Sequence, residues 1–228
     1  MRKILIFLVP CLITFQLNAQ NDSVEFKTIK DKAQNAYSKY IGFTSTQDQT
    51  IRNFDKKTGK LNSIEEIVID RTEYFYIKPV NKTISYRKNE SDLKPSDYEG
   101  NTRDPLFLPF ATDSDENYSL LFEGKKTIAK KECFSVKVIP KKKTVRHFKG
   151  YIYFDAVTFD MFYMDGTVAS LPPIIMESLL IQIYFTKVDD CSVMSKAIYT
   201  TEMNIPLKYP NTKQIKTVNI RNIKLIKK

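Results

Sequence analysis

Residues 133–139, Cys-Phe-Ser-Val-Lys-Val-Ile, decide the fold class of this chain. Phe134, Val136 and Val138 alternate with other residues, and a period of two places them together on one face of a β-strand. Pro140 and three lysines follow, which ends the strand and predicts a basic turn. The segment therefore predicts a strand with one buried face.

Segments with the same alternation and many β-branched residues lie on both sides of this strand. We predict strands over residues 44–54, 63–77, 83–87, 118–123, 133–139, 149–155, 161–165, 179–188, 195–205 and 213–226. In the last of them the apolar residues change face between Ile220 and Ile223, which predicts a β-bulge near Arg221-Asn222. About ten strands joined mostly by short turns favour one strongly curved antiparallel sheet.

One long helix is predicted ahead of the strands. Residues 23–40 carry apolar side chains at helical spacing, Ser23 is a suitable N-cap, and Gly42 is expected to end the helix. Such a helix can cover the concave face of a bent sheet. The predicted fold class is therefore mainly β (α+β), a strongly curved antiparallel sheet or incomplete β-barrel wrapped around one N-terminal helix.

Residues 1–19 have the three-part layout of a secretory signal peptide. Arg2 and Lys3 precede an apolar run over residues 4–15, and Ala19 supplies a small residue at the cleavage site. The run is shorter than the roughly 20 residues of a membrane-spanning helix. We expect cleavage after Ala19, a single domain over residues 20–228, and a periplasmic or extracellular location. An uncleaved anchor or a buried first helix is the alternative.

The chain is basic. Its formal net charge of +10 falls to +8 when Arg2 and Lys3 leave with the signal peptide. In an exported protein this charge argues against nucleic acid as a partner. It favours an anionic membrane surface or acidic glycans, or it serves solubility alone.

Two cysteines, Cys133 and Cys191, follow the signal peptide. In an oxidising compartment such a pair can close a disulfide, which would stabilise the domain. Two separate, partly buried thiols are the alternative, because spacing along the chain does not fix the distance between them.

The sequence contains no catalytic signature. His147 is the only histidine, and its place in a basic turn predicts an exposed side chain. Neither cysteine lies in a nucleophile motif, and the chain offers few nitrogen or sulfur ligands for zinc. Residues 113–117 begin like a calcium loop but lack its turn glycine and its bidentate glutamate. We therefore predict a non-enzymatic protein without cofactor or metal.

Two apolar groups lie on segments predicted to be irregular. One is an island in the polar region 88–118, and the other lies beside two prolines, where residues 174–178 are expected to form a short helical turn. Apolar side chains on such segments can form lids over an apolar cavity, and the alternative is that they plug the end of a small core. The candidate ligand-binding residues are Phe107, Leu108, Phe110, Ile174, Ile175, Met176 and Leu179.

The order of these elements resembles the bacterial outer-membrane lipoprotein carriers and their relatives, the LolA/LolB-like group. Phe122-Glu123-Gly124 followed by Cys133–Pro140 is similar to the mid-sheet strands of that group, and Tyr151–Asp155 with Thr158-Phe159 is similar to its recurring strand and turn. The resemblance covers most of residues 23–228. It implies an incomplete β-barrel around a helix, with an apolar cavity that can hold acyl chains.

The leading hypothesis is an exported, non-enzymatic carrier or sensor of a lipid-like or other apolar ligand, bound in the concave face of the sheet. Its expected partners are a lipid or lipoprotein acyl chain and an anionic membrane surface, and we expect a monomer. The alternative is a protein-interaction module of the cell envelope with a filled core and no ligand cavity. A hydrolase that gathers carboxylates from distant strands is a third, weaker hypothesis.

Overall fold

The computed structural model describes residues 23–75, 78–98, 106, 109–110, 114–172, 176–205 and 209–228. The predicted signal peptide lies outside these residues. Among the helices in the described ranges, none combines the length and the apolar character needed to cross a bilayer.

Helix α2 (Val24–Lys39) begins as the sequence predicts. Ser23 is its N-cap, and Ser23 Oγ accepts a hydrogen bond from the Phe26 N–H at 3.1 Å. The helix ends at Lys39 and passes directly into the first strand, so the prediction that Gly42 ends it was wrong. Gly42 instead allows a close approach of two strands, because a Cβ at this position would clash with the carbonyl oxygen of Glu73.

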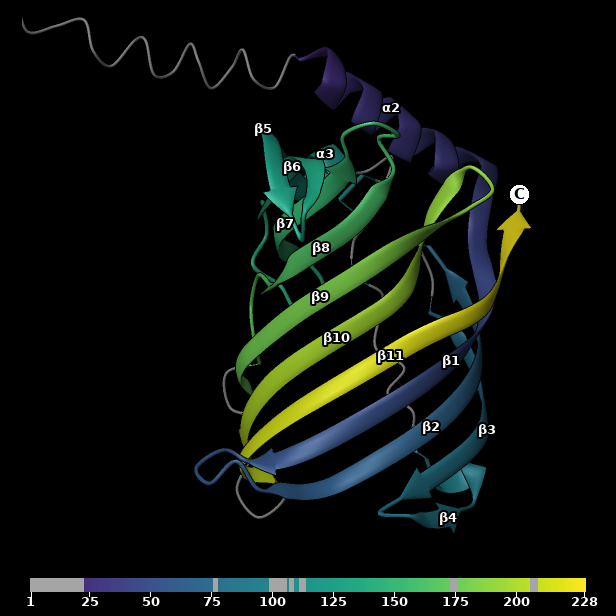
Figure 1. Cartoon of the computed structure of the whole chain (residues 1–228), viewed down its shortest axis with the longest axis vertical. Helices are drawn as coiled ribbons and strands as arrows, with labels where there is room; N and C mark the ends of the chain where they lie inside the picture. The colour runs from purple at the N-terminus through teal and green to yellow at the C-terminus, as the bar shows by residue number, and fades with distance from the viewer. Residues whose placement is uncertain are drawn as a thin grey trace, which may run out of the picture.

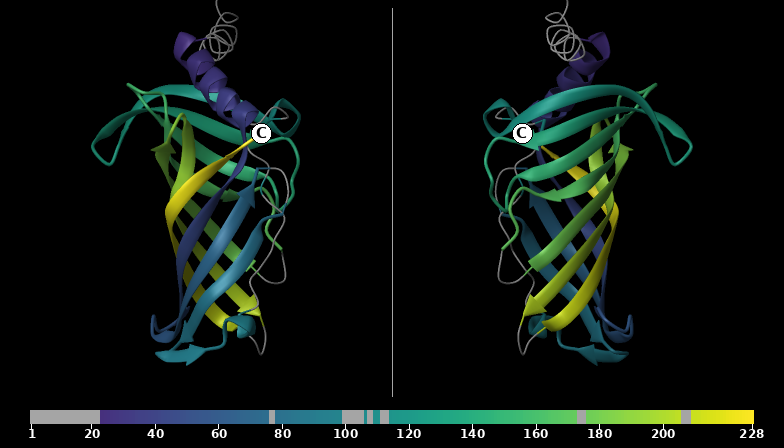
Figure 2. Two further views of the ribbon diagram at one scale, coloured as in Figure 1. Left: turned by 90° about the vertical axis from the view of Figure 1, so that its right-hand side faces the viewer. Right: turned by 90° about the vertical axis from the view of Figure 1, so that its left-hand side faces the viewer.

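One open antiparallel sheet follows, as predicted (Figures 1 and 2). Its strands are β1 (Tyr40–Asp55), β2 (Leu61–Tyr74), β3 (Val80–Lys88), β4 (Ser91–Leu93), β5 (Tyr118–Ile128), β6 (Lys131–Pro140), β7 (Phe148–Asp155), β8 (Met161–Val168), β9 (Met176–Val188), β10 (Cys191–Ile205) and β11 (Tyr209–Lys227). They lie in the order β4-β3-β2-β1-β11-β10-β9-β8-β7-β6-β5, so β4 and β5 form the two edges. The sheet curves strongly, and α2 crosses one end of it (Figure 1).

The first and the last described strands pair with each other in the middle of the sheet. Tyr40 of β1 lies opposite Lys227 of β11, and Asp55 lies opposite Thr212. The register shifts where β11 passes Asn222, which has a positive φ of 55°. This is the β-bulge that the sequence predicts, and it returns the apolar residues beyond it to the core side.

The main core lies on the concave face and combines residues of α2 with residues of strands β5 to β11. Its buried members are Phe26, Ile29, Phe110, Tyr118, Phe122, Phe134, Val136, Val138, Phe148, Ile152, Phe154, Met164, Val168, Ile181, Ile183, Ala197, Val218 and Ile220. Phe134, Val136 and Val138 are among them, as their alternation predicts. We call the opposite side of the sheet the outer face.

Two predicted irregular segments contain regular structure. Within 88–118, the described residues form β4, the short helix η1 (Pro95–Asp97) and α3 (Ser114–Asn117). Residues 176–178 begin β9, so the helical turn predicted there was wrong for its described part. Strand pairing with β10, in which Met176 lies opposite Met203, fixes this segment in the sheet.

Candidate functional site

The candidate site is the underside of α2, where the helix meets the concave face. Phe26 is 6% exposed and Ile29 is fully buried, so both side chains insert into the main core. The Phe26 ring stacks on Phe122 of β5, with 5.6 Å between ring centroids. The small residues Ala33 and Ala36 follow towards the C-terminal end of the helix. The helix therefore covers the apolar face through two large side chains near its start.

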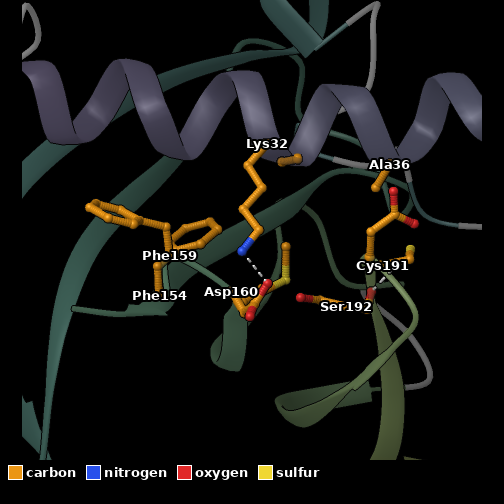
Figure 3. Close-up of a pocket in the computed structure, with 10 residues that line it drawn as sticks. Lys32, Ala36, Phe154, Phe159, Asp160, Cys191 and Ser192 are labelled. Carbon is orange, nitrogen blue, oxygen red and sulfur yellow. Dashed lines mark hydrogen bonds and ion pairs between the residues drawn. The ribbon is translucent and has the colours of Figure 1, made fainter. Parts of the chain in front are cut away.

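Two lysines of α2 form ion pairs with neighbouring elements. Lys32 Nζ lies 2.6 Å from Asp160 Oδ1 in the turn between β7 and β8, and it also donates to the Thr158 carbonyl oxygen at 2.6 Å (Figure 3). Lys30 Nζ lies 3.7 Å from Asp115 Oδ1. Burial acts to raise the pKa of Asp160, but hydrogen bonds from Lys32 and Thr158 outweigh it and hold that pKa below its usual range.

The C-terminal end of α2 is held by a second carboxylate. Asp190, in the turn between β9 and β10, accepts a hydrogen bond from Tyr40 Oη at 2.7 Å and forms an ion pair with Lys39. The hydrogen bonds from Lys39 and Tyr40 lower the pKa of Asp190 to about 2. In return, the Asp190 carboxylate raises the pKa of Tyr40 to about 12. The middle and the C-terminal end of the helix are thus tied to turns of the sheet.

A cavity of about 30 Å³ remains beneath the helix. It is lined by Lys32, Ala33, Ala36, Phe154, Phe159, Asp160, Met161, Asp190, Cys191 and Ser192 (Figure 3). This volume is about that of one water molecule. The space left between the described residues of helix and sheet is therefore small at this point.

The predicted ligand-binding residues that are described lie on or near this core. Phe110 is 1% exposed and meets Phe154 edge-on at 5.1 Å between centroids. Leu179 is partly buried and packs against the same cluster, and Met176 is buried at the start of β9. Phe107, Leu108, Ile174 and Ile175 lie outside the described residues.

The disulfide between Cys133 and Cys191 is not formed, because both thiols are free and buried in different clusters. Cys133 packs with Tyr153 and Tyr163 on the outer face, whereas Cys191 packs with residues at the end of α2. Four strand spacings separate β6 from β10, roughly 19 Å along the sheet, far beyond the reach of a disulfide. Burial raises the pKa of both thiols, that of Cys191 to about 11.

His147 is buried, so the prediction of an exposed side chain was wrong. It is 1% exposed, and its ring meets Tyr118 at 5.7 Å between centroids. Thr144 Oγ1 lies 2.6 Å from Nδ1, and Asn117 Oδ1 lies 3.3 Å from Nε2. Burial, together with the charges of Lys142 and Arg146, lowers the pKa of His147. The residue contributes to the core and not to a basic surface.

Sequence reasoning missed the charged residues that hold α2. Asp160 and Asp190 each end a turn between two strands, and such residues usually face solvent. Their position in the turns was the only feature of the sequence that could have indicated a contact with α2. Among the described residues, no group of three or more His, Cys, Asp or Glu side chains is arranged to hold a metal ion.

No protein-family model matches the chain, and no curated protein matches its sequence. Among solved structures, the chain is similar to an outer membrane lipoprotein-sorting protein domain from Vibrio parahaemolyticus. The two share 10% sequence identity with a TM-score of 0.44, and the match covers 88% of this chain and 90% of that one. It is also similar to a DUF1329 family protein from Desulfovibrio piger, with 11% identity, a TM-score of 0.42, and coverage of 87% and 92%.

A third similar structure is a LolA superfamily protein from Nitrosomonas europaea, with 10% identity, a TM-score of 0.39, and coverage of 89% of this chain and 94% of that one. The first and third come from the group that the sequence resembles.

Proposed function

We propose that this is an exported, non-enzymatic binding protein that takes a lipid-like ligand between α2 and the concave face of the sheet. In this proposal α2 is a lid, and the structure described is the closed form. The observation that carries it is the apolar face beneath the helix. Near its start, α2 covers this face with the side chains of Phe26 and Ile29. A ligand that displaces these two side chains would take their place against Phe122 and its neighbours.

The energies of closing the lid and of binding an acyl chain are comparable. Full burial of Phe26 and Ile29 contributes about 1.5–3 kcal/mol each, or about 3–6 kcal/mol together. An acyl chain gains about 0.8 kcal/mol per buried CH₂ group. About four to eight methylene groups would therefore offset the displacement of both side chains. Phe110, Met176 and Leu179 belong to this proposed site, as do the predicted residues outside the described ranges.

The basic surface supports the same proposal. With the net charge of +8 that remains when Arg2 and Lys3 leave the +10 of the full sequence, the exported protein would approach an anionic bilayer favourably. An acyl chain leaving such a bilayer would then meet a protein already held near its surface.

The first experiment asks whether lipid is bound. The protein would be purified without detergent, and its organic extract would be compared by mass spectrometry with that of an unrelated exported protein prepared in parallel. The purified protein would then be titrated with a fluorescent fatty-acid probe. We expect co-purified acyl species, or saturable probe binding. Lipid-free protein that ignores the probe would contradict the proposal.

A second candidate function, the interaction module, is favoured by one observation. The cavity beside Lys32 and Ala36 has a volume of only about 30 Å³, which supports a core that is filled at this point. A core that stays filled would leave the outer face and the edge strands β4 and β5 as binding surfaces. Absence of both lipid and probe binding, with capture of a protein partner, would establish this function instead.

A further inference from the structure

A second hollow lies away from α2, on the outer face of four neighbouring strands. It has a volume of about 370 Å³, within the usual range for ligand sites. It is lined by Thr44, Ser45, Thr46, Asp70, Arg71, Thr72, Val80, Lys82, Asn222 and Lys224. These residues come from β1, β2, β3 and β11, which lie side by side in Figure 1. We call this hollow the outer basin.

Strand register arranges the side chains of the outer basin in two rows. In one row Lys224 lies opposite Thr44, Thr44 opposite Thr72, and Thr72 opposite Val80. In the other, Thr46 lies opposite Asp70, and Asp70 opposite Lys82. Directly paired residues point to the same face of a sheet, so both rows share the outer face.

The β-bulge of β11 borders the outer basin. Asn222 has a φ of 55°, and the register between β1 and β11 shifts between Thr44 and Thr46. A bulge bends its strand and increases the local twist. The sheet is therefore not flat at this point, which explains why a hollow forms between exposed strands.

Two lysines of the outer basin have no anionic partner in the part of the chain that the structure describes. Within the described ranges, neither Lys82 nor Lys224 forms an ion pair, whereas the neighbouring Arg71 is paired with Glu73. Arg221, beside Asn222, is held by Asp48 through two contacts of 2.8 and 3.2 Å. Lys82 and Lys224 therefore supply the positive charge that is free to attract a ligand. This charge favours binding of an anionic ligand in the outer basin.

The remaining lining suits hydroxyl groups. Asp70 Oδ1 accepts a hydrogen bond from Thr46 Oγ1 at 3.0 Å, which leaves its second oxygen able to accept from a ligand. Thr44 and Thr72 add two more hydroxyls, and each can both donate and accept. Val80, 62% exposed, offers an apolar contact among these polar groups. A sugar ring presents the same combination of hydroxyls and apolar C–H groups.

The spacing of the two lysines points to more than one sugar unit. Lys224 lies on β11 and Lys82 on β3, so three strand spacings, roughly 14 Å, separate their backbones. One carboxylate would require both side chains to be fully extended towards it. We propose that the outer basin binds a short acidic oligosaccharide in which successive carboxylates pair with Lys82 and Lys224, while the threonines and Asp70 bind hydroxyls.

The test uses calorimetric titration of the full mature chain with digalacturonate, galacturonate and neutral cellobiose. We expect digalacturonate to bind most tightly and cellobiose to show no measurable binding. The variant Lys82→Gln/Lys224→Gln should bind digalacturonate roughly tenfold more weakly, since each exposed ion pair contributes at most about a fivefold effect. Higher salt should weaken binding by the wild type.

A matched control separates the site from the overall charge. Lys143→Gln/Lys149→Gln removes two exposed lysines from the turn before β7 and from β7 itself, with the same change in net charge. It should bind digalacturonate as the wild type does, and thermal melting should show all three proteins to be folded. The proposal would be overturned if the wild type did not bind digalacturonate or bound cellobiose equally well. It would also be overturned if Lys82→Gln/Lys224→Gln bound digalacturonate as tightly as the wild type, or if the control variant lost as much affinity as this variant.

Discussion

Replacing Ile29 by alanine would weaken the closed lid without removing any polar contact of α2. Ile29 is fully buried in the main core, and the substitution removes three carbon atoms from that contact. At about 0.8 kcal/mol per group, the closed form would lose about 2 kcal/mol relative to the displaced helix. If an acyl ligand competes with the closed lid, its apparent affinity should then rise by up to about 30-fold.

The assay is a fluorescent fatty-acid titration together with urea unfolding of the same samples. Ile67→Ala is the matched control, because Ile67 is 1% exposed but belongs to a separate cluster with Ile69 and Tyr86. Both variants should lower the free energy of unfolding by about 2–4 kcal/mol. Only Ile29→Ala should bind the probe more tightly. An equal change in both variants, or no change in either, would refute the role of α2 as a lid.

Three further predictions concern groups that the fold buries. Because burial lowers the pKa of His147, this imidazole binds a proton more readily in the unfolded chain than in the folded one. The free energy of unfolding should therefore fall as the pH drops below about 6.5. In urea titrations at several pH values, His147→Gln should make the free energy of unfolding depend less on pH. Gly42→Ala should reduce stability by about 1–3 kcal/mol, because the new Cβ meets the Glu73 carbonyl oxygen; an unchanged melting temperature would contradict this reasoning. Cys133 and Cys191 should react with a thiol reagent only after unfolding, and reducing agent should leave the melting curve unchanged.

Local patterns were enough to predict the strands and the core face. The alternation of Phe134, Val136 and Val138 is a property of adjacent residues, and all three lie in the main core. The change of face between Ile220 and Ile223 likewise predicted the bulge, because an extra residue must occur where alternation changes phase.

Contacts between distant segments could not be predicted in the same way. Lys32 and Asp160 are separated by more than half the chain, and only the curvature of the sheet brings the turn after β7 beneath α2. Burial of His147 likewise depends on Tyr118, which reaches it through strand pairing. The burial of an apolar side chain such as Phe110 could be expected from the sequence, because burial of apolar side chains needs no specific partner.

The central pairing of β1 with β11 has a consequence for how the molecule is made. Among the strands that the structure describes, β1–β4 are joined to β5–β10 only through β11, so the two groups remain separate sheets until β11 is synthesised. Contacts of such long sequence separation slow folding and leave strand edges open meanwhile. A chain shortened before residue 209 would therefore present two unjoined half-sheets with bare edges, and we would expect aggregation rather than a smaller native domain.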